Sequence, residues 1–382
     1  MNYVGFAIRK KRIENNWSQE GLCKGICAVS YLSKIEQGKV EASDEVVAQL
    51  FEKLGIKWIT DEKVLADGKK FVEEWYDAVF SEDYNAGNIF RKQLDEGYWM
   101  LENSPYAIDI LLLKELYSDE AGKLDETFEV CMDFRQLAIQ RILGGNFLEA
   151  EKLYPCAFSY LRAGYAAYEI GDNYSALMNL QKAYEIAAEE GRVRVMMMAK
   201  LYISTCYSNV GDIDAMEYHG TIAKRLALVL GENSLAETID YNYFATRMEK
   251  EEYKEAYDYF SKISSHGAFS LHKLAICCEK LGKVEEAFLA LEKEKTAEAD
   301  TEEMKALADK ACELVEYRLL HADYLSCADY GKKLLDYFNL CREKMPIGYA
   351  KFHLPWVMEW FKANRQYKQA YELLNDFSKN MK

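Results

Sequence analysis

The chain has 382 residues, of which 50% are apolar and 29% are charged, so it is long enough for two or more domains with buried cores. Its formal net charge of −15 excludes a protein that coats nucleic acid along its whole length. Only four prolines occur, and because proline breaks helices this scarcity predicts an all-α fold.

The charge is unevenly distributed along the chain. Residues 1–39 hold seven Lys or Arg side chains against three Glu, a net charge of +4, so the rest of the chain carries −19. A basic N-terminal head on an acidic body predicts that only the head meets the phosphates of a nucleic acid.

Cysteine and histidine spacings give no sign of a cofactor, a metal or a catalytic centre. Cys23 and Cys27 are four residues apart, Cys277 and Cys278 are adjacent, and no C-x-x-C pair or paired-His spacing occurs. We therefore expect reduced, buried thiols and no enzyme activity.

Without a signal peptide or an apolar run of ~20 residues, the sequence predicts a cytoplasmic protein.

The first elements in chain order are two short helices. Val4 and Ile8 begin an amphipathic pattern that ends near Asn15, in a pair of residues that favour turns. Ser18 is placed to cap a second helix that runs through Leu22 and Cys23.

Two further helices follow within residues 26–56. Ala28, Leu32 and Ile35 recur at helical spacing, which predicts that they face inward, and Gly38 stands where a helix would end. Ser43 starts another helix, whose apolar positions continue to residue 54.

This arrangement resembles the XRE (Cro/C1-type) helix-turn-helix, with residues 1–60 as the domain. Within that class the run from residue 26 to 36 looks PlcR-like, because it fits the pattern I-C-x-x-S-x-x-S-x-I-E. PlcR-like proteins belong to the peptide-pheromone regulators of Gram-positive bacteria. The resemblance implies a transcription regulator that binds double-stranded DNA.

In such a motif the third helix enters the major groove and presents its outward side chains to the base edges. Lys34 can donate to guanine and Val29 can pack on a thymine methyl group, while hydroxyl groups serve either role. Other side chains would hold phosphates. The expected base contacts are Val29, Ser30, Tyr31, Ser33 and Lys34, and the expected phosphate contacts are Arg12, Gln19 and Lys39.

From about residue 70 the sequence falls into helix pairs with a recurring pattern. A Gly-Asp turn or an equivalent is followed by an aromatic residue, then by Ala five residues after the Gly and by a large residue four positions later. Small alanines let two helices approach, and the aromatic residue would fill the gap between neighbouring pairs. The alanine anchors are Ala150, Ala176, Ala215, Ala256, Ala287 and Ala370.

The pattern resembles a degenerate tetratricopeptide repeat (TPR), so residues 61–382 are expected to form a TPR-like α-solenoid. Head and repeats together resemble the RRNPP regulators, which implies quorum sensing through a short linear signalling peptide. Asn side chains on the concave face could bind the peptide backbone, and Arg162 or Lys273 could hold a carboxylate. The candidate peptide-binding residues are Arg162, Tyr165, Tyr202, Thr205, Asn209, Tyr241, Asn242 and Lys273.

We further expect a homodimer on a palindromic operator, because one small motif contacts few base pairs. The dimer contact is expected in residues 61–382, where Trp356, Trp360 and Phe361 form either that contact or a terminal core. Three alternatives stay open. The repeats could bind a protein partner, the head could bind protein rather than DNA, or the chain could be a scaffold whose head has lost DNA affinity.

Overall fold

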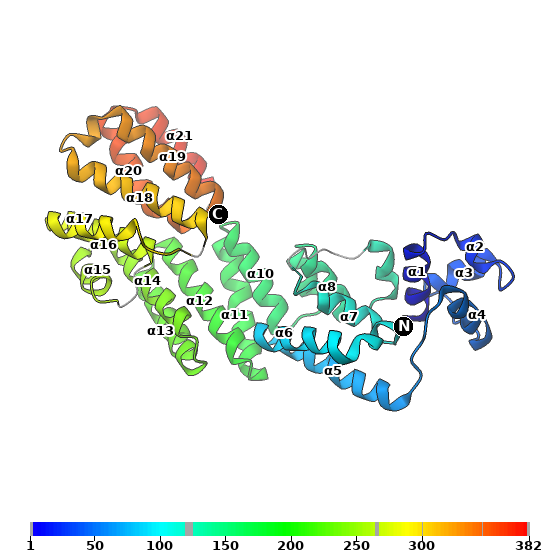
Figure 1. Ribbon diagram of the computed structural model, residues 1–382. Coiled ribbons are helices and arrows are strands. Elements are labelled where there is room, and N and C mark those ends of the chain that lie inside the picture. Colours follow the sequence, from blue (N-terminus) through cyan, green and yellow to red (C-terminus); the bar gives the residue numbers. More distant parts are fainter. Residues whose placement is uncertain (1–2, 119–124, 264–266, 300, 346, 380–382) are drawn as a thin grey trace. The chain divides into compact units, whose positions relative to one another are not determined.

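The computed structural model describes residues 3–118, 125–263, 267–299, 301–345 and 347–379. Every regular element in these ranges is helical and no β-strand occurs there, which confirms the all-α prediction (Figure 1). None of the helices described is both long enough and apolar enough to cross a membrane.

The chain divides into two compact units. The first comprises Met1–Ala163 with Lys182–Val195, and the second comprises Gly164–Gln181 with Met196–Lys382. The elements of the N-terminal stretch are α1 (Tyr3–Glu14), α2 (Gln19–Cys23), α3 (Val29–Glu36), α4 (Asp44–Leu54), α5 (Glu62–Phe80), α6 (Tyr84–Gln93), η1 (Leu94–Tyr98), η2 (Trp99–Asn103), α7 (Ala107–Glu115), η3 (Glu126–Cys131), α8 (Phe134–Leu143) and α9 (Phe147–Leu153).

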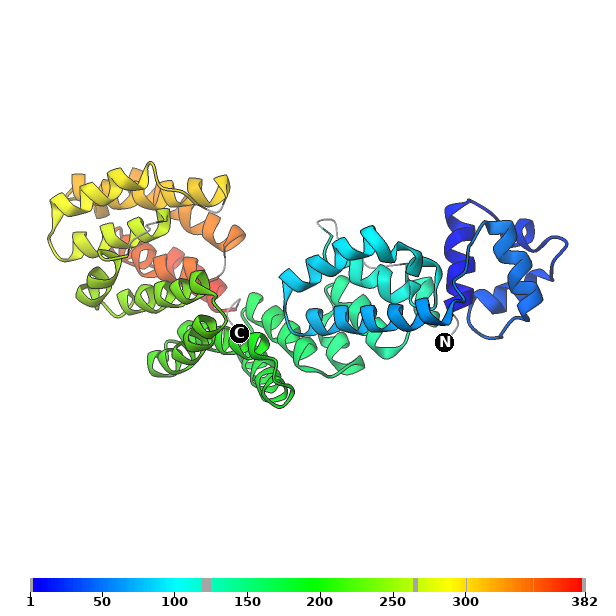
Figure 2. The same cartoon turned by 60° about the horizontal axis from the view of Figure 1, so that its bottom comes forward.

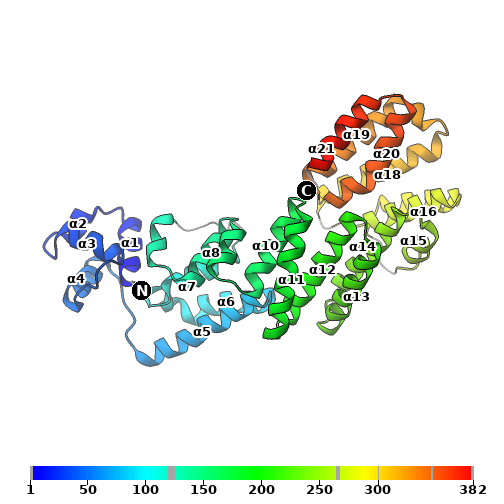
Figure 3. The same cartoon turned by 180° about the vertical axis from the view of Figure 1, so that it is seen from behind.

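The remaining elements are the helix pairs of the repeat region, whose C-terminal helices lie together in Figure 3. Their bounds are α10 (Ala157–Glu169), α11 (Asn173–Glu190), α12 (Val193–Val210), α13 (Ile213–Val229), α14 (Asn233–Met248), α15 (Tyr253–Phe260), α16 (Ala268–Lys280), α17 (Val284–Glu294), α18 (Glu302–Leu320), η4 (Tyr324–Ser326), α19 (Ala328–Lys344), α20 (Ile347–Ala363) and α21 (Tyr367–Lys379).

Helices α1–α4 form the head, drawn in blue in Figure 2. Ile8, Leu22, Leu32 and Ile35 are fully buried in its core, as the helical spacing predicts. The expected cap is present, because the Ser18 hydroxyl accepts a hydrogen bond from the Gly21 N–H at 3.0 Å.

The head also packs on the helices that follow it within the same compact unit. Phe6 in α1 is 1% exposed, and its ring meets the edge of Phe128 in η3 at a centroid distance of 5.1 Å. Arg9 donates from Nη1 to the Thr127 carbonyl at 3.0 Å. Helix α1 therefore has two buried faces, one inside the head and one against the first repeats.

The Gly-Asp turns of the repeats have a direct structural basis. Gly171 and Gly211 adopt φ values of 80° and 81°, a left-handed conformation that ends the preceding helix and suits glycine. Asp212 then caps α13 by accepting from the Ala215 N–H at 3.0 Å. Glu251 and Arg365 take the same left-handed conformation without glycine, which explains why the pattern is degenerate.

Most of the predicted small-residue anchors are buried. Ala150, Ala176, Ala256 and Ala287 are all 0% exposed, whereas Ala215 and Ala370 are half-buried. The prediction that each aromatic residue fills a gap between pairs is wrong at two positions, since Tyr174 is 76% exposed and Tyr367 is 62% exposed.

The C-terminal aromatic residues belong to a core of their own helices. Trp360 and Phe361 are 7% and 4% exposed and pack among α18, α19, α20 and α21, with Trp356 half-buried beside them. Gly331 makes this packing possible, because a Cβ atom there would come within 2.0 Å of the Trp360 ring. Of the two expectations for these residues, the structure supports the terminal core.

Candidate DNA-binding helix and ligand cavity

Helix α3 presents part of the expected base-contact set to solvent. Val29, Ser30 and Lys34 are exposed, while Leu32 and Ile35 on the opposite side are 0% exposed. The inward placement of Ala28 is wrong. It is exposed, because it occupies the N-cap position just before the helix begins.

The other expected contacts of α3 are less accessible. Tyr31 is half-buried and packs against the head core. Ser33 is also half-buried, and its hydroxyl accepts from Gln37 Nε2 at 3.2 Å. Lys39 is exposed directly after Gly38, whose φ of 67° ends the helix. The solvent-facing part of the set is thus Val29, Ser30, Lys34 and Lys39.

Two of the expected phosphate contacts are held inside the head. Arg12 donates to the Glu36 carboxylate from Nε at 2.6 Å and from Nη2 at 2.9 Å, and Gln19 donates from Nε2 to the same carboxylate at 2.8 Å. Glu36 is 1% exposed, so this network is internal. It ties α1, α2 and α3 together, which is a structural role for Arg12 and Gln19 beside the one expected from the sequence.

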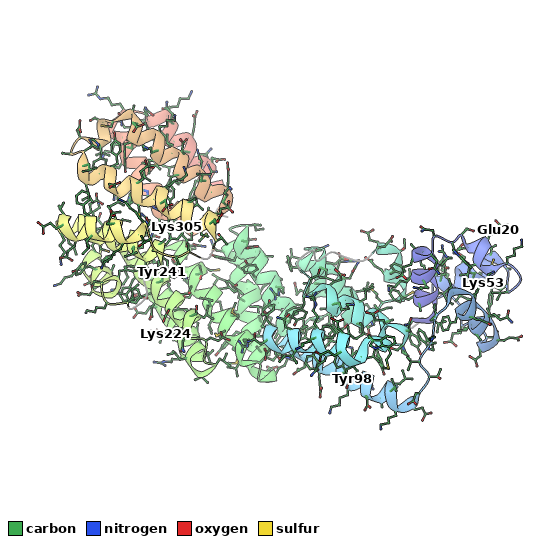
Figure 4. The ribbon with its side chains drawn as sticks, in the orientation of Figure 1. Glu20, Lys53, Tyr98, Lys224, Tyr241 and Lys305 are labelled. Atoms are coloured by element: carbon green, nitrogen blue, oxygen red, sulfur yellow. The ribbon has the colours of Figure 1, made fainter. Side chains whose placement is uncertain are left out.

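Half-buried Lys53 is a further basic residue of the head that makes internal contacts. Lys53 donates its ammonium protons to the carbonyls of Gly21, Leu22 and Lys24 at 3.1, 2.8 and 3.1 Å, so it closes the C-terminal end of α2. Figure 4 labels Lys53 on the head, together with Glu20.

The second unit contains a cavity of about 750 Å³. This volume lies within the ~300–1,000 Å³ range of ligand pockets. Figure 4 labels Lys224 and Tyr241, two of the lining residues. Its wall is formed mainly by α12, α13, α14, α16 and α20, and it includes Tyr168, Leu201, Thr205, Ser208, Asn209, Lys224, Tyr241, Asn242, Thr246, Glu249, Lys273, Tyr349 and Phe352.

Two asparagines from consecutive repeats line this cavity. Asn209 in α12 is 6% exposed and donates from Nδ2 to Asn173 Oδ1 at 3.4 Å. Asn173 in turn donates to the Gly171 carbonyl at 3.3 Å, so the repeat turn orients Asn209. Asn242 in α14 is exposed, and its side chain has no hydrogen-bond partner among the described residues. Both amides can therefore offer polar atoms to a ligand.

The hydroxyl groups around the asparagines are bonded to the helices themselves. Thr205 donates to the Leu201 carbonyl at 3.0 Å, and Ser208 shares a 2.8 Å hydrogen bond with Thr246. Their protons are already donated within the fold, so these hydroxyl groups can offer a ligand acceptor lone pairs and apolar contact.

Lys273 in α16 is the most unusual group in the wall. It is 3% exposed, and its Nζ atom lies 3.1 Å from the centroid of the Phe352 ring. Burial lowers the pKa of this ammonium group to about 7.

Tyr241 adds a second buried polar atom to the same wall. Its Oη atom is inaccessible and has no hydrogen-bond partner, and burial raises the pKa of the phenol well above its usual value. A buried hydroxyl without a partner is costly, so this atom favours a ligand or a water that can bond to it.

Five of the eight candidate peptide-binding residues line the cavity and three do not. Arg162 belongs to the first unit, where it pairs with buried Glu82 at 2.9 Å. The rings of Tyr165 and Tyr202 are in tilted contact at a centroid distance of 4.9 Å, and the ring of Tyr202 contacts that of Tyr168 at 5.9 Å. The five that line the cavity are Thr205, Asn209, Tyr241, Asn242 and Lys273.

Some lining residues had no signal in the sequence pattern. Tyr349 and Phe352 come from α20, more than one hundred residues after α14, and only the folding of the repeats brings them to the wall. Lys351 in the same helix fixes this approach by pairing with Glu249 at 3.0 Å. Asn173, which orients Asn209 from behind the wall, lies in a turn that the repeat pattern predicts. The pattern does not predict its hydrogen bond with Asn209.

Comparisons with known proteins agree with this geometry. The helix-turn-helix family matches residues 8–59. The transcriptional activator NprA of Geobacillus stearothermophilus is 25% identical over 276 residues, which cover 63% of this chain and 67% of NprA. These findings indicate a DNA-binding transcription regulator.

Two solved structures match parts of this chain. A Rap protein in complex with the competence and sporulation factor has a TM-score of 0.52 at 15% identity, over 84% of this chain and 99% of the Rap chain. PlcR of Bacillus thuringiensis in complex with the peptide PapR7 and DNA has a TM-score of 0.31 at 16% identity, over 63% of this chain and 99% of PlcR. The likeness to the Rap structure shows a shared fold of the helical repeats.

Proposed function

We propose that this chain is a transcription regulator whose DNA binding is controlled by a short signalling peptide bound in the 750 Å³ cavity. Residues 1–60 bind the operator, and residues 61–382 bind the peptide and form a homodimer in the cytoplasm. The observation that carries the proposal is the pair of cavity asparagines, Asn209 and Asn242, on consecutive repeats.

Asparagine suits an extended peptide because one amide donates to a backbone carbonyl and accepts from a backbone N–H. Asn209 is already oriented by Asn173, so little side-chain entropy is lost when it binds a ligand. The Rap protein of similar fold is in complex with the competence and sporulation factor, which supports a ligand for this fold. A protein partner would need a contact surface far larger than this cavity.

The test starts from the ligand that co-purifies with the full-length chain and is identified by mass spectrometry. Calorimetry then measures the binding of the synthetic ligand to the parent and to Asn209→Ala and Asn242→Ala. Removal of amide hydrogen bonds should weaken binding by ~1–3 kcal/mol for each asparagine. DNA binding without the ligand should stay within about twofold of the parent.

Asn339→Ala is the matched control, because Asn339 is an exposed asparagine of α19 outside the cavity wall. It should bind the ligand as the parent does. If both cavity variants bind the co-purified peptide as tightly as the parent, the peptide site lies elsewhere. Capture of a folded protein in place of a peptide would favour the protein-partner alternative.

A further inference from the structure

Three of the six charged groups that line the cavity are neutralised in ion pairs. Lys224 bonds both oxygens of Asp240 at 2.7 Å, and Glu249 pairs with Lys351 at 3.0 Å. Lys273 differs from them, since no carboxylate among the described residues lies within 4 Å of its ammonium group. Its closest aromatic contact is the Phe352 ring.

A buried lysine without a direct ion pair is costly, because the ammonium group loses its hydration and the more distant Glu249 carboxylate compensates only in part. The contact with an aromatic ring offsets only part of that cost. Lys273 nevertheless lines a cavity of 750 Å³ rather than a closed core, so an incoming group can reach it. The natural complement of this group is an anion with oxygen acceptors.

Lys273 lies on the first helix of the helix pair that follows the two pairs carrying Asn209 and Asn242. Asn209, Asn242 and Lys273 come from α12, α14 and α16, the first helices of three consecutive pairs. Helices α12 and α14 are joined by the Ser208–Thr246 hydrogen bond. With packed helices ~8–10 Å apart, the three positions span ~16–20 Å. An extended chain rising ~3.3 Å per residue covers this distance with about five or six residues.

We propose that Lys273 binds a carboxylate group of the peptide, so that the ligand lies with this end at α16 and its backbone at Asn242 and Asn209. The C-terminal carboxylate and an acidic side chain share this chemistry. The proposal rests on the proposed function. It adds the direction in which the peptide lies in the cavity and the chemical group that the cavity selects.

Two further observations agree with it. Burial lowers the pKa of Lys273 to about 7, and a bound carboxylate would favour the charged form and reverse this shift. Arg162, the other candidate for this role, is already paired with Glu82 in the first unit. Between the two residues that the sequence offered, the structure assigns the carboxylate to Lys273.

The experiment uses three pools of synthetic heptapeptides and the full-length chain. The first pool lacks Asp and Glu and has free C-termini, and the second has the same sequences with amidated C-termini. The third is amidated and carries one Glu at varied positions. Peptides retained by the protein in ultrafiltration are quantified by mass spectrometry at pH 6.5, where the ammonium form of Lys273 is populated.

We expect the parent to retain the first pool at least tenfold more than the second. Retention of the third pool above the second would identify an acidic side chain as the source of the carboxylate. Lys273→Met should abolish either preference. Lys200→Met is the matched control, since Lys200 is also buried, at 5% exposure, but lies outside the cavity wall, and it should keep the preference.

Equal retention of the three pools by the parent would overturn the carboxylate proposal, and so would a preference that survives in Lys273→Met. The proposed function fails in a different way. If the parent retains no pool better than the Asn209→Ala/Asn242→Ala double variant does, the peptide does not bind in this cavity. Both the proposed function and the carboxylate proposal are then wrong. Melting temperatures and DNA binding of Lys273→Met show whether the variant is folded.

Discussion

Burial of the Lys273 ammonium group destabilises the folded chain by an amount that depends on pH. The pKa is about 7 in the folded chain and 10.5 in the unfolded chain, and burial causes the difference. Between these values the unfolded chain holds the proton and the folded chain does not, so stability rises with pH through this window. Below pH 7 the folded chain carries the charge and the whole penalty is present.

From this we predict that Lys273→Met stabilises the ligand-free chain. The gain should be ~4–5 kcal/mol below pH 7, because each pKa unit is worth ~1.4 kcal/mol, and it should shrink as the pH approaches 10. Melting temperatures at pH 6, 7.5 and 9 measure it. Lys250→Met, at an exposed position, serves as control. A gain that is the same at all three pH values would contradict the assignment of a buried, unpaired ammonium group.

Arg12 and Lys34 are both basic residues of the head, but their surroundings predict opposite effects of substitution. Arg12→Met leaves the Glu36 carboxylate, 1% exposed, without its bidentate partner and should destabilise the head by ~3–5 kcal/mol. Lys34→Ala removes an exposed side chain and should change stability by less than ~0.5 kcal/mol. It should instead weaken specific DNA binding by ~1–3 kcal/mol.

Melting curves and fluorescence anisotropy separate the two effects, with a duplex selected from random DNA by the parent chain as the probe. The double variant Arg12→Met/Glu36→Leu should recover part of the stability lost in Arg12→Met, since it removes the unpaired carboxylate. If Arg12→Met melts like the parent and binds DNA more weakly, Arg12 acts as the phosphate contact that the sequence suggested.

At the scale of elements, the turns between helices carry a testable conformational cost. Gly282 has a φ of 72° and open space around its Cα atom, so Gly282→Ala adds a strained backbone without a steric clash. We predict a loss of ~1 kcal/mol. Glu251 already has a φ of 63°, and Glu251→Gly should raise stability or leave it unchanged. Gly97→Ala, also in open space but without a left-handed φ, should cost nothing. Equal effects of the two alanine substitutions in thermal unfolding would refute this explanation.

The elements themselves could be predicted because their signals are local. Ser18 capped its helix, the Gly-Asp pairs marked the turns, and the small-residue spacing found four fully buried alanines. Contacts between distant elements could not be predicted in this way. Periodicity shows that one face of a helix is buried, but it does not identify the partner. Two such contacts between distant elements are the packing of Phe6 in α1 against η3 and the approach of α20 to the cavity.

The positions of the candidate site residues in the fold could be predicted to the same extent. Asn209 and Asn242 reach one cavity because the repeat spacing fixed which helix each belongs to. Arg162 lies outside the cavity wall, and its ion pair with Glu82, which joins residues 80 positions apart, leaves no local trace in the sequence. The inward placement of Ala28 was wrong for a simpler reason. A shift of one residue at a helix start changes an N-cap into a core position, and boundaries are the least certain part of a sequence pattern.

For the whole molecule, charge and DNA binding are linked through the head. Residues 1–39 carry a net +4 while the remaining chain carries −19, so only the head can gain from phosphate contact. The acidic repeats are repelled by the duplex, which favours a complex that touches DNA through the head alone. The number of heads on one DNA molecule then decides how strongly salt weakens binding.

This gives a test of the homodimer. Each neutralised phosphate contributes about −0.9 to the slope of log K against log salt concentration. A homodimer on a palindromic duplex should therefore show about twice the slope that it shows on a duplex with one half-site, because two heads release counter-ions instead of one. Anisotropy titrations between 50 and 200 mM salt measure both slopes, and light scattering gives the stoichiometry. If Lys34 contacts a phosphate, Lys34→Ala should reduce the slope measured on the palindromic duplex about twice as much as the slope measured on the half-site duplex. If Lys34 contacts a base, the substitution should leave both slopes nearly unchanged. Equal slopes on the two duplexes, with one chain bound to each, would show that the chain acts as a monomer.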